Sequence, residues 1–351
     1  MTPFAERLLG WFDQHGRSDL PWQHPRTPYR VWVSEIMLQQ TRVETVIPYF
    51  QRFMEHFPDV EALAAADQDT VLHLWSGLGY YARARNLHRA AQQIASEHGG
   101  SFPDTREALE ELPGIGRSTA AAIIAQAHDR PEPILDGNAK RVLARHATIE
   151  GWPGNPAVQR ALWAEAEART PATRCADYTQ AIMDLGALLC TRTRPDCRHC
   201  PVASDCQALA QGRTGELPAP RPRKDLPTRI RHAAHLQTAQ GSLLVQRAAQ
   251  GIWGGLYSLP EAAEAPELDA WVRTQWPQAE ANETIGLRHT FSHYHLDLRI
   301  HRYHLPPNAC GIMEGDRAIW YKPGTSRAVG IPAPIQRYLH EHKDSGNGTN
   351  R

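Results

Sequence analysis

The sequence lacks three features that would define its class at once: an excess of charge of one sign, a long apolar run and an export signal. Lysine and arginine together number 38, as do aspartate and glutamate, so the formal net charge is zero. This neutrality argues mildly against a nucleic-acid partner, and any binding to a polyanion must come from cations that share one local surface. No apolar stretch approaches the length of a membrane span, and Glu6, Arg7 and Asp13 interrupt the N-terminal apolar residues. We therefore expect a cytoplasmic, monomeric protein without a membrane partner, long enough for two or three domains.

Cysteine is also scarce, with six residues in 351, but four of the six lie close together. In a chain without an export signal, such clustering indicates a metal site rather than disulfides. The spacing is Cys190-x6-Cys197-x2-Cys200-x5-Cys206. Zinc sites favour two short knuckles separated by a long loop, so this spacing favours a [4Fe–4S] cluster, with zinc as the alternative. Three arginines between the cysteines indicate a structural support that holds cations toward a phosphate backbone, and a redox role is the alternative.

Residues 112–138 form the segment around which the rest of the chain is organised. Pro113 ends a short helix, Gly114 and Gly116 permit a tight turn with unshielded amides, and Ser118 opens an alanine-rich second helix. Two helices joined in this way direct free N–H groups and a helix N-terminus at one point, which is a site for a phosphate. A Rossmann turn would need a third glycine and a preceding strand, and a Walker loop would need a lysine after its last glycine. A plain helix connector remains the alternative.

Glu35 is the strongest candidate for a general acid. Ser34 can cap a helix, which would place Glu35 in its first turn, where an acid commonly does no more than complement the helix dipole. Its neighbours at positions 31–33, 36 and 38 are apolar, so the carboxyl is expected to be partly buried. Burial raises the pKa of a carboxyl and lets it keep a proton near neutrality, as a general acid must.

Two tyrosines follow a pair of glycines in the sequence Gly77-Leu-Gly79-Tyr80-Tyr81. Beside a run of arginines, they could place an aromatic wedge against stacked bases, although packing is the ordinary role of such residues. Trp22 could likewise belong to the core or line a cavity.

The C-terminal part of the chain changes character after a proline-rich linker at 213–229. Residues 243–245 and 296–300 have the pattern of strands and residues 269–275 that of a helix, which predicts an α+β domain. Phe291, His293 and His295 would share one strand face. Alternating histidines can bind a metal, but polar surface is the simpler reading, and a Phe-Ser-His tip could instead recognise a base.

Together these residues resemble the MutY family of adenine DNA glycosylases over nearly the whole chain. The segments that carry the resemblance are Val-Ser-Glu-Ile-Met-Leu-Gln-Gln-Thr (33–41), Gly-Leu-Gly-Tyr-Tyr-Ala-Arg-Ala-Arg (77–85), Leu-Pro-Gly-Ile-Gly-Arg-Ser-Thr (112–119), Leu-Asp-Gly-Asn (135–138), the four cysteines and Phe-Ser-His (291–293). The hairpin and the cysteines alone are shared with the wider endonuclease III superfamily.

The resemblance implies a mainly α N-terminal part followed by a smaller α+β Nudix-like domain. The expected divisions are a six-helix barrel with the helix-hairpin-helix at 26–138, a [4Fe–4S] cluster helical domain made of 1–25 and 139–212, the linker at 213–229, and a Nudix-like 8-oxoguanine recognition domain at 230–351. The implied partner is double-stranded DNA containing adenine:8-oxoguanine or adenine:guanine mispairs, and the implied place in the cell is the nucleoid.

The resemblance also implies roles for individual residues. Glu35 would protonate the adenine leaving group and assist water, while Asp136 would stabilise the oxocarbenium-like sugar, a division of labour that two different carboxyl environments can create. Gln40 and Tyr80 would fill or wedge the base stack after adenine has flipped out. The remaining contacts implied are Gly114, Gly116, Ser118 and Asn138 on DNA, Trp22 and Gln180 in the adenine pocket, and Phe291, Ser292 and His293 on 8-oxoguanine.

Two alternatives remain. An endonuclease III-like pyrimidine glycosylase/lyase would carry a lysine nucleophile where this chain has Ser118, and some MutY relatives carry tyrosine there. A non-catalytic iron–sulfur DNA-binding module is the second alternative. The acidic helix of active Nudix hydrolases is missing after Tyr257, so we expect a lesion reader rather than a pyrophosphohydrolase.

Overall fold

The computed structural model describes the chain except for residues 223–224, 239, 306–316, 323–328 and 343–351. It contains two units, one formed by Met1–Ala65 with Asn86–Arg223 and the other by Ala66–Arg85 with Lys224–Arg351. In the described part of the chain, no helix is long and apolar enough to cross a membrane.

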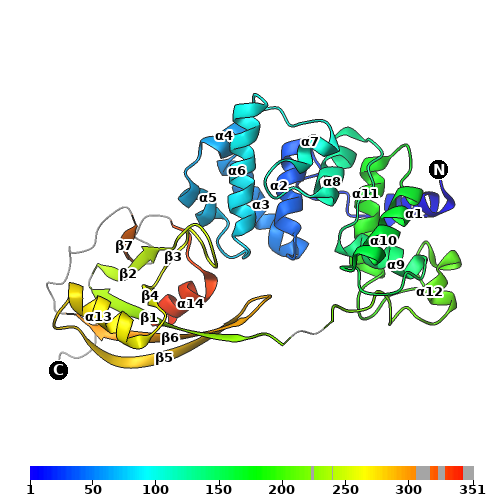
Figure 1. Cartoon of the computed structure of the whole chain (residues 1–351). Helices are drawn as coiled ribbons and strands as arrows, with labels where there is room; N and C mark the ends of the chain where they lie inside the picture. The colour runs from blue at the N-terminus through cyan, green and yellow to red at the C-terminus, as the bar shows by residue number, and fades with distance from the viewer. Residues whose placement is uncertain (223–224, 239, 306–316, 323–328, 343–351) are drawn as a thin grey trace, which may run out of the picture. The chain divides into compact units, whose positions relative to one another are not determined.

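The first unit is helical (Figure 1). Its elements are α1 (Pro3–His15), α2 (Pro28–Leu38), α3 (Val43–His56), α4 (Val60–Ala65), α6 (Ala82–Glu97, whose first residues are grouped with the second unit), α7 (Arg106–Glu110), α8 (Arg117–His128), α9 (Gly137–His146), α10 (Pro156–Arg169), α11 (Cys175–Asp184), the π-helix η1 (Leu185–Leu189), the 3-10 helix η2 (Ala203–Asp205) and α12 (Gln207–Ala210).

The helix α2 begins six residues earlier than Ser34, which the sequence analysis offered as its cap. Thr27 is the N-cap and accepts a hydrogen bond from the amide of Arg30, with Pro28 at the first helical position. The hydroxyl of Ser34 instead donates to the carbonyl of Val31 inside the helix, at 2.8 Å. The expectation that Glu35 lies in a first turn is therefore wrong, and its acid does not serve the helix dipole.

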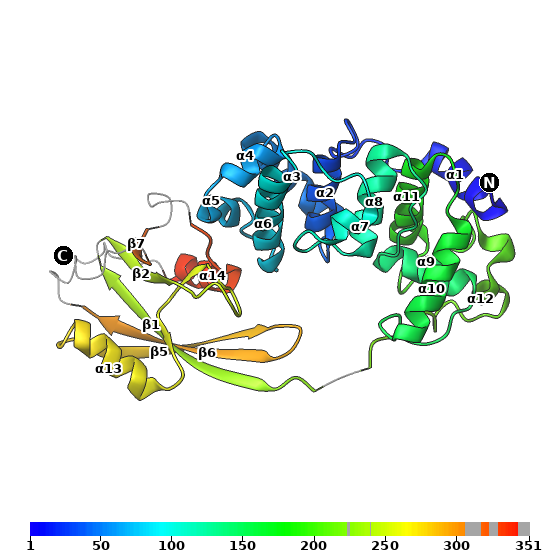
Figure 2. The ribbon, with the colours of Figure 1, turned by 45° about the horizontal axis from the view of Figure 1, so that its top comes forward.

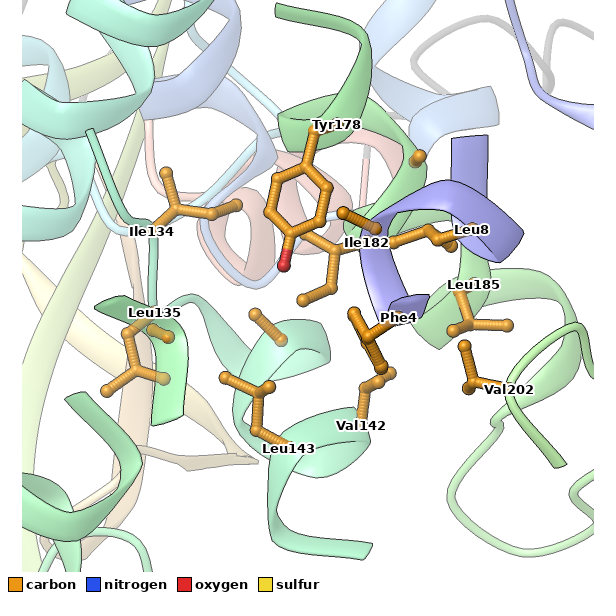
Figure 3. Close-up of a cluster of buried hydrophobic side chains, with 14 of the residues drawn as sticks. Phe4, Leu8, Ile134, Leu135, Val142, Leu143, Tyr178, Ile182, Leu185 and Val202 are labelled. Carbon is orange, nitrogen blue, oxygen red and sulfur yellow. The ribbon is translucent and has the colours of Figure 1, made fainter. Parts of the chain in front are cut away.

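The centre of the first unit is the pairing of α8 with α2 and α11. All six residues of α8 from Ala120 to Ala125 are buried alanines or isoleucines, whose small or compact side chains allow close helix packing. A hydrophobic core joins α1 to α9 and α11. In it, Phe4 of α1 lies among side chains of α9 and α11, including Val142 and Ile182 (Figure 3). Leu135 belongs to this core and fixes the backbone immediately before Asp136.

The second unit is built on a twisted sheet (Figure 2). Its strands run in the order β3-β2-β1-β6-β5; β1 and β6 are parallel and β5 and β6 are antiparallel, while β4 pairs with β1 and β7 with β2. The elements are α5 (Gln68–Leu74), β1 (Thr228–Thr238), β2 (Gly241–Gln246), β3 (Tyr257–Ser258), β4 (Glu261–Ala262), α13 (Ala265–Gln275), β5 (Glu280–Thr290), β6 (His295–His304), β7 (Ala318–Tyr321) and α14 (Ala333–Glu341).

Alternate residues of β1 supply two separate cores. Ala233 packs in a cluster with Ile335 and Leu339 of α14, while Ala234 packs in another with Leu268 of α13, as the alternation of a strand requires. The two helices therefore cover opposite faces of the sheet. Residues 66–85 join this unit through hydrogen bonds such as that from the Tyr81 hydroxyl to the carbonyl of Ile331, at 3.1 Å.

Residues 291–294 form the turn between β5 and β6. The expectation that Phe291, His293 and His295 share one strand face is therefore wrong for the first two, since only His295 lies in a strand. The amide of Phe291 donates to the carbonyl of Tyr294 across the turn, at 2.9 Å, which closes the hairpin.

Candidate active site

The carboxyl groups of Glu35 and Asp136 line one pocket of about 1070 Å³ in the first unit. Glu35 is carried near the C-terminal end of α2, and Asp136 precedes α9, so two segments about one hundred residues apart meet here. The other residues of this pocket that the sequence analysis singled out are Trp22, Gln40, Ser118, Asn138 and Gln180.

Glu35 is a partly buried carboxyl whose ionisation is disfavoured. Burial raises the pKa of Glu35 to about 7, and the nearby charge of Asp136 acts in the same direction. Against these two effects, Nε2 of Gln126 on α8 donates a hydrogen bond to Oε1 of Glu35 at 3.0 Å, which lowers the pKa. The carboxyl can therefore hold a proton at neutral pH and can also release it.

Asp136 is the N-cap of α9. Its Oδ1 accepts a hydrogen bond from the amide of Ala139 at 2.7 Å. Burial raises the pKa of Asp136, whereas the amides of Ala139 and Asn138 and the charges of Arg141 and Lys140 lower it. The anion of Asp136 thus has amide donors and two cations for stabilisation, whereas Glu35 has one amide donor. If the pair holds one proton, Glu35 is the group that carries it.

A buried ion pair between Arg17 and Asp184 supports the side of the pocket that α11 forms. Arg17 donates to Oδ1 of Asp184 from Nε at 3.0 Å and from Nη2 at 2.7 Å, and Gln180 donates to the same oxygen at 2.8 Å. Gln180 is 3% exposed, and its own Oε1 has no hydrogen-bond partner in the described residues. Trp22 is buried and also lines the pocket, with its ring edge-on to Phe50 at 5.5 Å.

The hairpin expected between residues 112 and 119 is present. Gly114 has a φ of 80°, and a Cβ there would approach the side chain of Asn86 to 2.8 Å, so glycine is required. Gly116 is the exposed N-cap of α8 and has open space around it. The hydroxyl of Ser118 accepts a hydrogen bond from the amide of Leu135 at 3.0 Å, which ties the hairpin to the segment that carries Asp136.

Gln40, Tyr80 and Asn138 are the remaining candidates for contacts with DNA. Gln40 and Tyr80 both have left-handed backbones, with φ of 60° and 49°; Gln40 belongs to the first unit and Tyr80 to the second. Tyr80 is 54% exposed, which is high for an aromatic side chain. Oδ1 of Asn138 accepts a hydrogen bond from Nη2 of Arg141 at 2.8 Å, and Asn138 lines the pocket.

The four cysteines at 190, 197, 200 and 206 line a second pocket of the first unit. Burial raises the pKa of Cys200 to about 12, and the other cysteines of the group add to the shift. Arg145 of α9 spans the site, because its guanidinium donates to Sγ of Cys190 at 3.3 Å and to the carbonyls of Thr191 and Leu217. In the described part of the chain, no three cysteine, histidine or acidic side chains converge closely enough to hold a single metal ion.

In the second unit, Phe291 packs against Trp253 at 5.5 Å and against His289 at 4.5 Å between ring centroids. Ser292 and His293 at the tip of the turn are exposed, and the Ser292 hydroxyl lies 3.4 Å from Nδ1 of His293. Both polar groups are accessible to a ligand.

The sequence analysis missed Gln126 and Arg17. A single amide inside a run of buried alanines and isoleucines was a usable signal for Gln126, because such a group needs a buried partner. Arg17 gave no comparable signal, since its partner Asp184 lies 167 positions away.

Comparison with known proteins identifies the families of both parts of the chain. Residues 33–168 match the model of the HhH-GPD superfamily base excision DNA repair protein, and residues 232–341 match the NUDIX domain. A solved structure of a thermostable thymine-DNA glycosylase has 26% sequence identity and a TM-score of 0.53, and the likeness covers 59% of this chain and 95% of that one. An endonuclease III–DNA complex, at 19% identity and a TM-score of 0.51, shares the fold over 60% of this chain and 94% of its own.

The curated relatives extend the likeness to the full length. The adenine DNA glycosylase of Buchnera aphidicola subsp. Acyrthosiphon pisum (strain APS) is 36% identical over 341 residues, covering 97% of this chain and 97% of that protein. The adenine DNA glycosylase of Homo sapiens is 35% identical over 366 residues, covering 86% of this chain and 67% of that protein. The expected architecture, a helical part followed by a Nudix-like domain, is confirmed, and the chain belongs to the MutY family of adenine DNA glycosylases.

Proposed function

We propose that this chain, a DNA N-glycosylase of base excision repair that acts on adenine, removes adenine mispaired with 8-oxoguanine or guanine by base flipping and hydrolysis of the N-glycosidic bond. The observation that carries the chemistry is the meeting of Glu35 and Asp136 in one pocket, where burial raises the pKa of Glu35 to about 7.

The two carboxyl groups divide the reaction between them. Glu35 donates its proton to the adenine leaving group, which makes the base a better leaving group as the glycosidic bond breaks. The anion of Asp136, held by the amide of Ala139, stabilises the cationic sugar that forms. Glu35, now ionised, then accepts a proton from the attacking water and returns to its starting state.

Trp22 and Gln180 are proposed to form the adenine pocket. The free Oε1 of Gln180 can accept a hydrogen bond from the exocyclic amine of adenine, and the buried Trp22 supplies an apolar surface for the base. The bond from Gln180 to Asp184 fixes the orientation of this amide.

The remaining contacts of the partner, DNA, are proposals of the same kind. The exposed amides at Gly114 and Gly116 and the N-terminus of α8, with Ser118 and Asn138 nearby, would bind the phosphate backbone. Gln40 and Tyr80 would occupy the base stack. Both residues have a left-handed backbone, which is uncommon for residues other than glycine.

Phe291, Ser292 and His293 are proposed to read 8-oxoguanine. Phe291 offers an aromatic surface supported by Trp253, and the exposed hydroxyl and imidazole of its two successors can hydrogen-bond to the edge of the oxidised base. We further propose that the protein acts as a monomer at the nucleoid, with the domain divisions given by the sequence analysis.

We favour a [4Fe–4S] cluster over a zinc ion at the cysteines, because their spacing lacks the two short knuckles separated by a long loop that zinc sites favour. The four side chains line one pocket of the first unit. Cys190, Cys197, Cys200 and Cys206 would hold the cluster, which would act as a structural support. Arg145 would then brace the loop from the side of α9.

The deciding experiment measures single-turnover base release from duplexes with adenine opposite 8-oxoguanine, guanine or thymine. Adenine opposite 8-oxoguanine should react fastest, opposite guanine more slowly, and opposite thymine least. Borohydride should trap no covalent enzyme–DNA adduct, because Ser118 offers no amine. Trapping on abasic DNA together with pyrimidine release would support the endonuclease III-like alternative, and no base release at all would support the non-catalytic module.

A further inference from the structure

We propose that Gln126 is a positioning residue for this reaction: its carboxamide fixes the orientation of the Glu35 carboxyl and selects which of its two oxygens carries the proton. The inference rests on the proposed role of Glu35 as the general acid.

Gln126 stands out in its own helix. The preceding six residues of α8 are buried alanines and isoleucines, and Gln126 is itself only 3% exposed. An amide removed from water without a partner costs about 1–3 kcal/mol in proteins, so its presence here needs an explanation. Its Nε2 donates to Oε1 of Glu35 at 3.0 Å, and this bond supplies the explanation.

The Gln126 amide contacts the Glu35 carboxyl on the side that faces the helix packing, away from the pocket. Glu35 is among the residues that line the pocket, and Gln126 is not. Because α8 packs against α2, the donor is held on a fixed scaffold and not on a loop. A carboxyl oxygen that accepts an N–H bond is a poor place for the acidic proton, so the proton is favoured on Oε2, the oxygen left for the substrate.

The bond also sets how readily Glu35 gives up its proton. Burial and the charge of Asp136 both raise the pKa of Glu35, and the hydrogen bond from Gln126 lowers it. Without that bond the acid would be weaker, and the ionised form needed to activate water would be less accessible. Gln126 therefore balances the two forms of Glu35 that the reaction uses in turn.

Two neighbouring groups, besides burial, shift the pKa of Glu35. Asp136 is the ionisable group whose charge shifts the pKa of Glu35, and Gln126 is the hydrogen-bond donor that opposes it. The other charged side chains that line the pocket are Arg17, which is paired with Asp184, Arg42 and Glu44 at the start of α3, and Arg141, which is bound to Asn138.

The test replaces Gln126 with methionine, which has a similar volume and no donor. Single-turnover adenine release is measured from pH 5.5 to 9.5 for the wild type, Gln126→Met, Glu35→Gln and Gln92→Met. Gln92 is an amide on α6 that lies near His88 and does not contact Glu35, so it controls for the loss of an amide. Circular dichroism and the thermal midpoint of each variant report its folding.

We expect Gln126→Met to lower the plateau rate about 10- to 100-fold, because the acid is misplaced. The alkaline limb of its pH profile should also move upward by about half to one pH unit, since loss of the donor raises the pKa of Glu35. Gln126→Glu keeps the volume and a polar head, but once ionised it replaces the N–H donor with an anion beside Glu35. Its alkaline limb should therefore move upward at least as far as that of Gln126→Met, and its rate should stay below that of the wild type. This second variant keeps the inference testable if Gln126→Met fails to fold.

A Gln126→Met protein with the wild-type rate and pH limb, or with a lower rate at an unchanged limb, would overturn the inference and leave Gln126 a packing residue. Full adenine release by Glu35→Gln would instead overturn the proposed function itself, so the two failures can be told apart.

Discussion

Arg17 and Asp184 form a buried ion pair that joins the loop after α1 to the end of α11. The carboxylate is fully buried and accepts two bonds from the guanidinium, one from the amide of Arg17 at 2.7 Å and one from Gln180. Every oxygen of Asp184 is therefore satisfied, and the pair fixes Gln180, the proposed adenine contact. This network couples the stability of the first unit to the shape of its pocket.

Asp184→Ala should destabilise the protein by about 3–5 kcal/mol, because it leaves the Arg17 cation in a partly buried site without its counter-charge. The measurement is the free energy of unfolding in urea. The matched control is Glu167→Gln, which breaks the exposed pair with Arg117 and should cost at most about 1 kcal/mol. Equal losses for the two variants would contradict a special role for the buried pair.

Glu35→Gln should stabilise the protein more at pH 8 than at pH 5. The folded-state pKa of Glu35, about 7, lies above the ordinary value of 4.5, so the folded state binds more protons between these two values and its stability falls as pH rises through them. Glutamine has no such proton to lose. The difference in unfolding free energy between the variant and the wild type should therefore grow by about 2 kcal/mol from pH 5 to pH 8. A pH-independent difference would show that the carboxyl is not perturbed.

Asp136→Asn should separate the charge of this residue from its capping role. Asparagine is as good an N-cap as aspartate, so the bond to the amide of Ala139 and the stability of α9 should survive within about 0.5 kcal/mol. Adenine release should fall about 100-fold or more, because a neutral amide cannot stabilise a cationic sugar. The measurements are single-turnover release and the thermal midpoint.

Asp136→Ala is the companion variant, which removes both functions and should lose about 1 kcal/mol of stability as well. Retention of activity in Asp136→Asn would show that the cap alone is needed.

The sequence predicted those parts of the site that depend on local backbone rules. The glycines at 114 and 116 mark a turn that was visible in a few consecutive residues. The helix start at Asp136 follows an equally local rule, but the sequence analysis reached Asp136 only through the family resemblance and did not predict its role as an N-cap. Glu35 was expected to be a buried acid because of its neighbours, although the start of its helix was misplaced by seven residues. The misplacement arose because Ser34 satisfies its hydroxyl within the helix and Thr27 makes the cap.

The parts that the sequence did not predict depend on contacts between distant segments. The partner of Gln126 lies 91 positions away, and that of Arg17 lies 167 positions away. Neither spacing follows from periodicity, because the packing of α8 on α2 and the path of the loop after α1 decide it. The turn at residues 291–294 was taken for a strand for the related reason that alternating side chains do not reveal where a hairpin reverses.

Arg145→Met should weaken the retention of iron by the proposed cluster site. Arg145 is 2% exposed. Its guanidinium donates to Sγ of Cys190 and to four backbone carbonyls, those of Cys190, Thr191, Arg192 and Leu217, so it fixes the loop that carries the first cysteine. Partners of this kind around a metal site are worth about 10- to 100-fold in affinity, and we expect a chelator to remove iron from the variant faster by a comparable factor.

The control is Arg7→Met, the same substitution in the exposed pair with Asp205, the residue before Cys206, where the geometry predicts little change in iron release. Iron and sulfide content of the purified proteins should be equal to each other in the wild type, as a [4Fe–4S] cluster requires, and lower in Cys200→Ser. Zinc in place of iron, or release rates that do not differ between the two arginine variants, would contradict the cluster and the brace respectively. Because Arg145 lies on α9, whose N-cap is Asp136, iron loss should also slow adenine release, and the two rates measured on one preparation would show whether the cluster supports the position of the catalytic anion.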